Sequence, residues 1–151
     1  MPKLKNALLA VMMFLLATRG HTFTCYYSLV KDSCWTNYDL QVEVVDAKSN
    51  QKVLQITIPK GKSWARQEFA CEPAQSYAYT ASYQPVFWQT EVGKTYKSLR
   101  YWTMPYEITN QTSAWNISVC FPRDFAGVPF PPEAKGNCEC DFKSLPEIKP
   151  K

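Results

Sequence analysis

Apolar and small or polar residues alternate one by one along most of the chain between residues 23 and 121. The alternation is clearest at residues 76–84, where Tyr77, Tyr79, Ala81 and Tyr83 are separated by smaller residues. A period of two residues is typical of a β-strand with one buried face. No stretch of helical length shows the 3.6-residue period of an amphipathic helix. The chain is therefore predicted to be all-β.

Eight stretches are predicted to be strands, and segments rich in polar residues, Pro or Gly separate them. They cover residues 23–30, 35–45, 53–58, 63–71, 76–84, 86–92, 96–103 and 114–121. Short strands at intervals of roughly 8–12 residues favour a sandwich or a barrel. Two antiparallel layers explain the alternation best, because one face of each layer then packs inward. We expect an immunoglobulin-like antiparallel β-sandwich of about 7–8 strands over residues 21–121.

The chain changes character after residue 121. Residues 122–151 hold six of the eleven prolines and also Cys138 and Cys140. Proline favours extended, polyproline-like backbone. We expect a Pro-rich tail that its cysteines hold against the sandwich domain.

Residues 1–20 have the layout of a secretory signal peptide. Lys3 and Lys5 precede an apolar stretch at residues 7–17, and Thr18 and Gly20 are the small residues at the −3 and −1 positions of a cut after Gly20. A membrane-spanning helix needs about 20 apolar residues, so cleavage is favoured over anchoring. The mature chain then has 14 basic and 13 acidic residues, instead of the net +4 of the whole sequence. We therefore expect a secreted or periplasmic protein with no transmembrane segment and no basic patch for nucleic acid.

All six cysteines lie downstream of this segment, which predicts disulfides in an oxidising compartment. They are Cys25, Cys34, Cys71, Cys120, Cys138 and Cys140. Six cysteines allow 15 pairings, and the sequence does not choose among them. One interpretation has Cys71 and Cys120 joining the two layers. Another has the tail cysteines and those that flank the first strand tying both ends of the chain to the body.

The composition leaves few catalytic options. The single histidine, His21, removes Ser-His-Asp and Cys-His machinery. It would be the mature N-terminus, and an N-terminal His chelates copper in lytic polysaccharide monooxygenases, but their site needs a second His. Cys138-Glu139-Cys140 lacks the second pair of ligands that a zinc site requires. We therefore expect no enzyme activity, no metal and no cofactor.

The aromatic residues are the remaining functional signal, because Tyr and Trp are enriched at recognition surfaces. The candidates for binding are Tyr77, Tyr79, Tyr83, Tyr96, Tyr101 and Trp102. One interpretation places them in the core, and the other makes them a platform for a sugar or a partner protein. The leading hypothesis is a non-catalytic binding or accessory module for a protein or glycan.

Two alternatives remain. The mature size, the secretion signal, the six cysteines and the all-β pattern resemble the secreted lipid-recognition family, which implies a carrier with an apolar cavity between its sheets. The cysteine spacing of that family is not reproduced, so no residue roles carry over. The other alternative is a glycoside hydrolase with paired carboxylates, although Asp39, Glu43 and Glu68 fall on outward strand positions.

Asn110 and Asn116 begin N-x-[ST] sequons, which are glycan acceptors in a eukaryotic secretory pathway.

Overall fold

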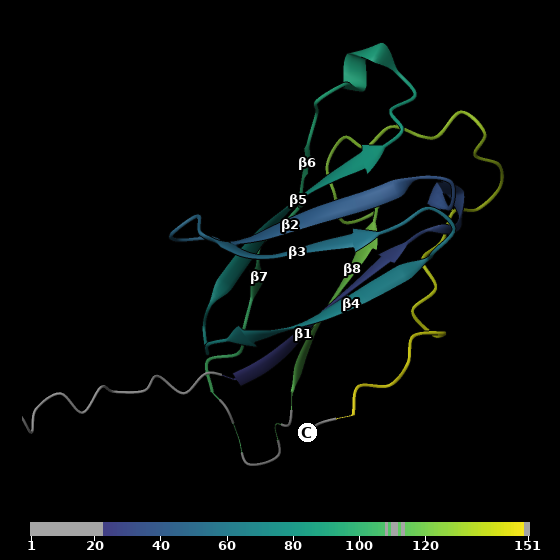
Figure 1. Cartoon of the computed structure of the whole chain (residues 1–151). Helices are drawn as coiled ribbons and strands as arrows, with labels where there is room; N and C mark the ends of the chain where they lie inside the picture. Colours follow the sequence, from purple (N-terminus) through teal and green to yellow (C-terminus); the bar gives the residue numbers. More distant parts are fainter. Residues whose placement is uncertain (1–22, 108, 110–111, 113, 150–151) are drawn as a thin grey trace, which may run out of the picture.

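The structure, a computed structural model, describes residues 23–107, 109, 112 and 114–149. The predicted signal peptide, His21 and Asn110 lie outside the described residues. Two β-sheets lie one above the other (Figure 1). No helix among the described residues is long and apolar enough to cross a membrane. The prediction of an all-β, two-sheet protein is confirmed.

The smaller sheet has the strand order β4-β1-β8. Its strands are β1 (Phe23–Lys31), β4 (Trp64–Cys71) and β8 (Trp115–Phe121). The central strand β1 is antiparallel to β4 but parallel to β8, with Tyr27 opposite Gln67 on one side and Ile117 on the other. The expectation of a wholly antiparallel sandwich is therefore wrong for this pair. A parallel pair needs a long connection between its strands, and the whole of the second sheet lies between β1 and β8 in the sequence.

The larger sheet has the order β3-β2-β5-β6, and β7 also pairs with β5. Its strands are β2 (Asp39–Asp46), β3 (Lys52–Ile58), β5 (Ser76–Gln84), β6 (Tyr96–Lys97) and β7 (Trp102–Thr103). All pairs in this sheet are antiparallel. The hairpin predicted from residues 35–45 and 53–58 corresponds to β2 and β3.

Two of the predicted strands are not formed as expected. Residues 86–92 form a loop with the short 3-10 helix η2 (Gln89–Glu91), and residues 96–103 supply only β6 and β7. Pro85 lies directly before the first of these stretches and cannot donate to a strand ladder. Phe87 instead packs its ring 5.3 Å from that of Tyr83. The apolar residues of this segment therefore cover the end of the core without joining a sheet.

The inward faces of the two sheets form one packed aromatic and aliphatic core. Leu29 and Val119 of the smaller sheet and Leu40 and Val42 of the larger sheet are fully buried. Trp35, in the 3-10 helix η1 (Ser33–Trp35) between β1 and β2, is the largest buried side chain. Alternation along each strand places these apolar side chains on the same face, and burial of that face drives the sheets together.

Three disulfides use all six cysteines, and none is free. Cys25–Cys71 joins β1 to β4 within one sheet, so the expected bond between layers through Cys71 and Cys120 is wrong. Cys34–Cys138 and Cys120–Cys140 attach the segment after β8 to the rest of the chain. The described part of that segment, residues 122–149, contains no strand or helix and meets the larger sheet through a bridge between Ser98 and Phe125.

Candidate binding groove between β7 and β8

Four of the six aromatic candidates belong to the core. Tyr77, Tyr79, Tyr83 and Tyr96 expose between 0% and 4% of their surface. The first three occupy alternate positions of β5, and alternation turns all of them toward the smaller sheet. Burial, which disfavours a phenolate, raises the pKa of Tyr77 and Tyr96. The hypothesis that these four form a surface platform is therefore wrong.

The polar tips of two buried tyrosines are satisfied near the surface, which explains how the core accommodates them. The Tyr77 hydroxyl donates to the Gln75 side chain, and the Tyr96 hydroxyl donates to the Glu91 carboxylate. A buried hydroxyl needs such a partner. Tyr77 and Tyr96 thus fit core positions because each has a nearby acceptor, whereas the buried Tyr83 hydroxyl has no hydrogen-bond partner among the described residues.

The other two candidates, Tyr101 and Trp102, lie together at a surface groove. Tyr101 is 68% exposed, and Trp102 is half-buried. The groove has a volume of about 460 Å³. It is lined by Arg100, Tyr101, Trp102, Thr103, Met104, Pro105, Trp115 and Asn116. We call it the β7–β8 groove, because its two walls come from β7 of the larger sheet and the start of β8 in the smaller one.

The wall on the β7 side is held by the neighbouring strand β5. Trp102 and Thr103 pair with Tyr77 and Ser76. The hydroxyl groups of Ser76 and Thr103 lie 2.8 Å apart, at hydrogen-bonding distance. The Met104 N–H donates to the Gln75 carbonyl at 2.8 Å, and Met104 itself is buried. Trp102 therefore projects from backbone that is fixed on both sides.

The opposite wall is held by β1. The ring of Trp115 lies 4.5 Å from that of Phe23. The side-chain oxygen Oδ1 of Asn116 accepts a hydrogen bond of 2.7 Å from the Ser28 hydroxyl, and the side-chain nitrogen Nδ2 of Asn116 donates to the Ser118 hydroxyl at 2.9 Å. The Ser28 hydroxyl also accepts from the Arg66 guanidinium at 2.7 Å. This row of polar contacts crosses all three strands and fixes the Asn116 side chain.

The lining chemistry suits recognition. Indole and phenol rings offer flat apolar surface, Arg100 supplies the only charge, and no lining residue carries a carboxylate. General acid–base catalysis needs a titratable group at hydrogen-bonding distance from the substrate. Trp115 and Asn116 were not among the binding candidates predicted from the sequence, although both line the groove. Trp115 shares an inward strand face with Ile117 and Val119, and only its place at the strand end marks it as accessible.

The inward faces of the two sheets are closely packed in the part of the chain that the structure describes. Inward residues such as Leu29, Val42 and Val119 are fully buried, and none of the hollows among the described residues that we measured is lined by the aliphatic faces of both sheets. A lipid carrier requires an apolar cavity. The packed interior therefore argues against the carrier hypothesis.

The acidic residues considered for the glycoside hydrolase hypothesis lie on the strands of the two sheets. Asp39 and Glu68 are exposed, and the Glu43 carboxylate pairs with Lys52 at 3.3 Å.

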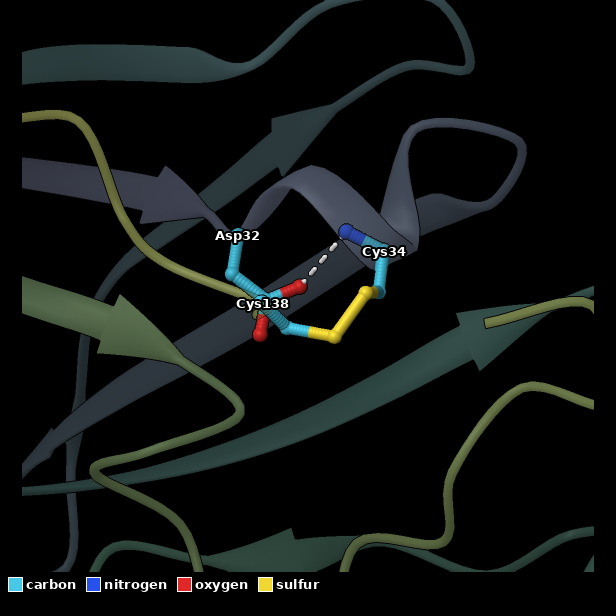
Figure 2. A group of neighbouring side chains, drawn as sticks. All are labelled: Asp32, Cys34 and Cys138. Carbon is cyan, nitrogen blue, oxygen red and sulfur yellow. Dashed lines mark hydrogen bonds between the residues drawn. A yellow bond between two sulfur atoms is a disulfide. The ribbon is translucent and has the colours of Figure 1, made fainter. Parts of the chain in front are cut away.

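A second cluster, Asp32, Cys34 and Cys138, has three potential metal ligands within 4.8 Å of one another (Figure 2). Its two sulfur atoms are bonded to each other, so neither is the thiolate that would bind zinc. The Asp32 carboxylate accepts a hydrogen bond of 3.0 Å from the Cys34 N–H and caps η1. Burial raises the pKa of Asp32. In this oxidised state the cluster is a capped turn beside a disulfide.

No protein-family model matches this chain, and neither a search of curated proteins nor a search of solved structures found a match. The β7–β8 groove is therefore the structural basis for assigning a function.

Proposed function

We propose that this protein is a secreted, non-catalytic binding module whose partner, a protein or a glycan, contacts the β7–β8 groove. The observation that carries the proposal is the exposed ring of Tyr101 beside the half-buried rings of Trp102 and Trp115. Aromatic side chains with one accessible face are enriched at recognition surfaces. The fixed backbone of both walls means that little conformational freedom is lost on binding.

The three disulfides support export to an oxidising compartment, either the periplasm or the extracellular space. Disulfides persist there, whereas cytosolic thiols are kept reduced. The signal peptide predicted from residues 1–20 would provide the route. Secretion and binding together favour an accessory module that meets its partner outside the cytosol.

The strand order supports an immunoglobulin-like arrangement. In such sandwiches the second and fifth strands pair in one sheet, while the third, sixth and seventh share the other. If β1 takes the place of the second strand, then β4 takes the place of the fifth, and β2, β5 and β6 follow in the opposite sheet. The first position is then filled from the other end of the chain by β8, which explains its parallel pairing with β1.

The proposal is tested by probing the chain with a glycan array and with a phage-displayed library of random peptides. Replacement of a central aromatic contact typically costs about 2 kcal/mol or more, which is roughly a 30-fold loss of affinity. Tyr101→Ala should therefore weaken every ligand that the groove selects by at least tenfold. Trp88→Ala is the matched control, because Trp88 is also exposed, at 51%, but lies outside the groove. Ligands that bind Tyr101→Ala as tightly as the unaltered chain would contradict the proposal.

A further inference from the structure

The outer edges of the two sheets are not equally protected against pairing with another strand. Proteins protect sheet edges with charged side chains, very short strands, prolines or bulges. β4 carries Arg66 and Glu68, β3 begins at Lys52, and β6 and β7 have two residues each. β8 has seven residues without a charge, a Pro or a Gly, and its register with β1 has no bulge. β8 is thus the edge among the described strands that lacks these protections.

The backbone directions along β8 show which of its groups face outward. The Cys120 N–H donates to the Asp124 carboxylate at 2.7 Å, and the Cys120 carbonyl accepts from the Asp124 N–H at 2.9 Å. The Phe121 carbonyl, one residue later, accepts instead from Asp32 at the end of β1. Because directions alternate along a strand, the N–H and C=O groups of Asn116 and Ser118 face outward, as those of Cys120 do.

The outward-facing N–H and C=O groups of β8 differ in whether another part of the chain already forms hydrogen bonds with them. The segment that follows β8 covers Cys120 through Asp124. No backbone hydrogen bond from the described loops and turns reaches Asn116 or Ser118. Asn116 is exposed and Ser118 is half-buried, so both are close to solvent. Backbone hydrogen bonds from the described residues therefore close the second half of the β8 edge but not the first half, which we call its open half. Residues 142 and 145–148 of the C-terminal segment line a hollow beside Asn116 and Ser118 without a backbone hydrogen bond to either residue.

The open half of this edge lies at the β7–β8 groove, which Trp115 and Asn116 help to line. A strand added beside β8 would place alternate side chains toward the larger sheet, where Trp102 and Met104 form the far wall. Arg100 is the only charged residue in the lining. Charge complementarity therefore favours a partner strand with a carboxylate.

We propose that the groove takes an extended peptide segment of a partner protein, which pairs as an additional strand with the backbone of Asn116 and Ser118. An apolar side chain of the peptide fills the space between Trp102 and Trp115, and an acidic side chain meets Arg100. Main-chain hydrogen bonds then supply affinity, and the side chains that enter the groove supply specificity. This inference rests on the proposed function and narrows its partner to a protein.

The test uses the mature chain and a phage-displayed library of random peptides, with counter-selection against Tyr101→Ala. Enriched peptides are synthesised and methylated at one backbone nitrogen at a time. N-methylation at every second residue, where the N–H faces β8, should weaken binding at least tenfold, while methylation at the intervening residues should leave it unchanged. Enriched peptides should also share an acidic residue and lose affinity toward Arg100→Ala.

A variant of the protein tests the other side of the same hydrogen bonds. Ser118→Pro removes one outward N–H, and proline is tolerated at an edge position whose N–H points away from the sheet. It also removes the hydroxyl that accepts from the Asn116 side chain, so Ser118→Ala, which lacks the hydroxyl but keeps the N–H, is its matched control and should bind the peptides more tightly than Ser118→Pro. We expect Ser118→Pro to fold and to bind the enriched peptides at least tenfold more weakly, while Trp88→Ala binds normally. The methylation series keeps the test decisive if Ser118→Pro does not fold.

Three results would overturn the inference. The first is tolerance of methylation at every position by peptides that still need Tyr101, which would leave the groove as a binding site but exclude strand pairing. The second is Tyr101-dependent binding of a glycan with no enrichment of peptides. The third is the absence of enrichment for both probes, which would also contradict the proposed function.

Discussion

Replacing Trp35 with alanine should remove a large part of the stability of this protein. Trp35 is 1% exposed and lies between the two sheets. Its ring is 4.7 Å from that of Tyr83 on β5 and 4.8 Å from that of Phe121 on β8. It also contacts Tyr38 and Phe87, at 5.1 and 6.0 Å. One side chain thus joins both layers and the loop that covers the end of the core.

The expected loss follows from the size of the cavity that the substitution creates. Truncation of a buried Trp to Ala costs about 3–5 kcal/mol, against a total stability of about 5–15 kcal/mol for a typical domain. With a urea dependence of about 2 kcal/mol per molar, the unfolding midpoint should fall by about 2 M. Circular dichroism in a urea series, with all three disulfides oxidised, measures this shift.

The control is Trp88→Ala, because Trp88 is half exposed and its ring contacts only that of Phe87 among the described rings. We expect a loss below about 1 kcal/mol for this exposed position. The reasoning would be refuted if Trp35→Ala and Trp88→Ala shifted the midpoint equally, since the interior would then not be packed as described.

Two further predictions concern pH and the disulfides. The Ser49 N–H, the Gln75 amide and the Lys48 N–H lower the pKa of Asp46 to about 2, so its contribution to stability should be complete above about pH 4 and be lost as the pH falls toward 2. Asp46→Asn should remove this part of the pH dependence of the urea midpoint. Chain entropy predicts that loss of Cys34–Cys138, with a separation of 104 residues, costs about 5 kcal/mol. Loss of Cys120–Cys140, with a separation of 20, should cost about 3 kcal/mol. The measurement is thermal unfolding of two variants, each with both cysteines of one disulfide replaced by serine. A lower unfolding temperature for the variant without Cys120–Cys140 than for the variant without Cys34–Cys138 would contradict this prediction.

The strands were predictable where one face of the strand is apolar and the other is small or polar. Residues 76–84 form β5 with the bounds that the alternation predicts. The strand predicted at residues 86–92 does not form, because β-propensity indicates only that a residue fits a half-buried surface. Phe87 obtains that burial from Trp35 and Tyr83 without any strand partner. Tertiary contacts thus replaced the sheet that local propensity suggested.

The binding candidates show a different limit. Tyrosine suits both a core and a recognition surface, so the sequence predicted the strand but not the use of its tyrosines. Tyr77 and Tyr101 differ in exposure only because Tyr77 lies on the inward face of a long strand and Tyr101 lies just before a short one. Disulfide pairing was equally inaccessible, because Cys25 meets Cys71 only through the register of β1 and β4.

Amide hydrogen exchange along β8 tests the central claim, that the open edge beside the β7–β8 groove is the contact surface. In the free protein the amides of Asn116 and Ser118 should exchange rapidly, while those of Ile117 and Val119, which face β1, should be protected. An enriched peptide should protect the first two and leave the others unchanged. Equal protection of all four amides in the free protein, or no added protection from the peptide, would contradict the claim.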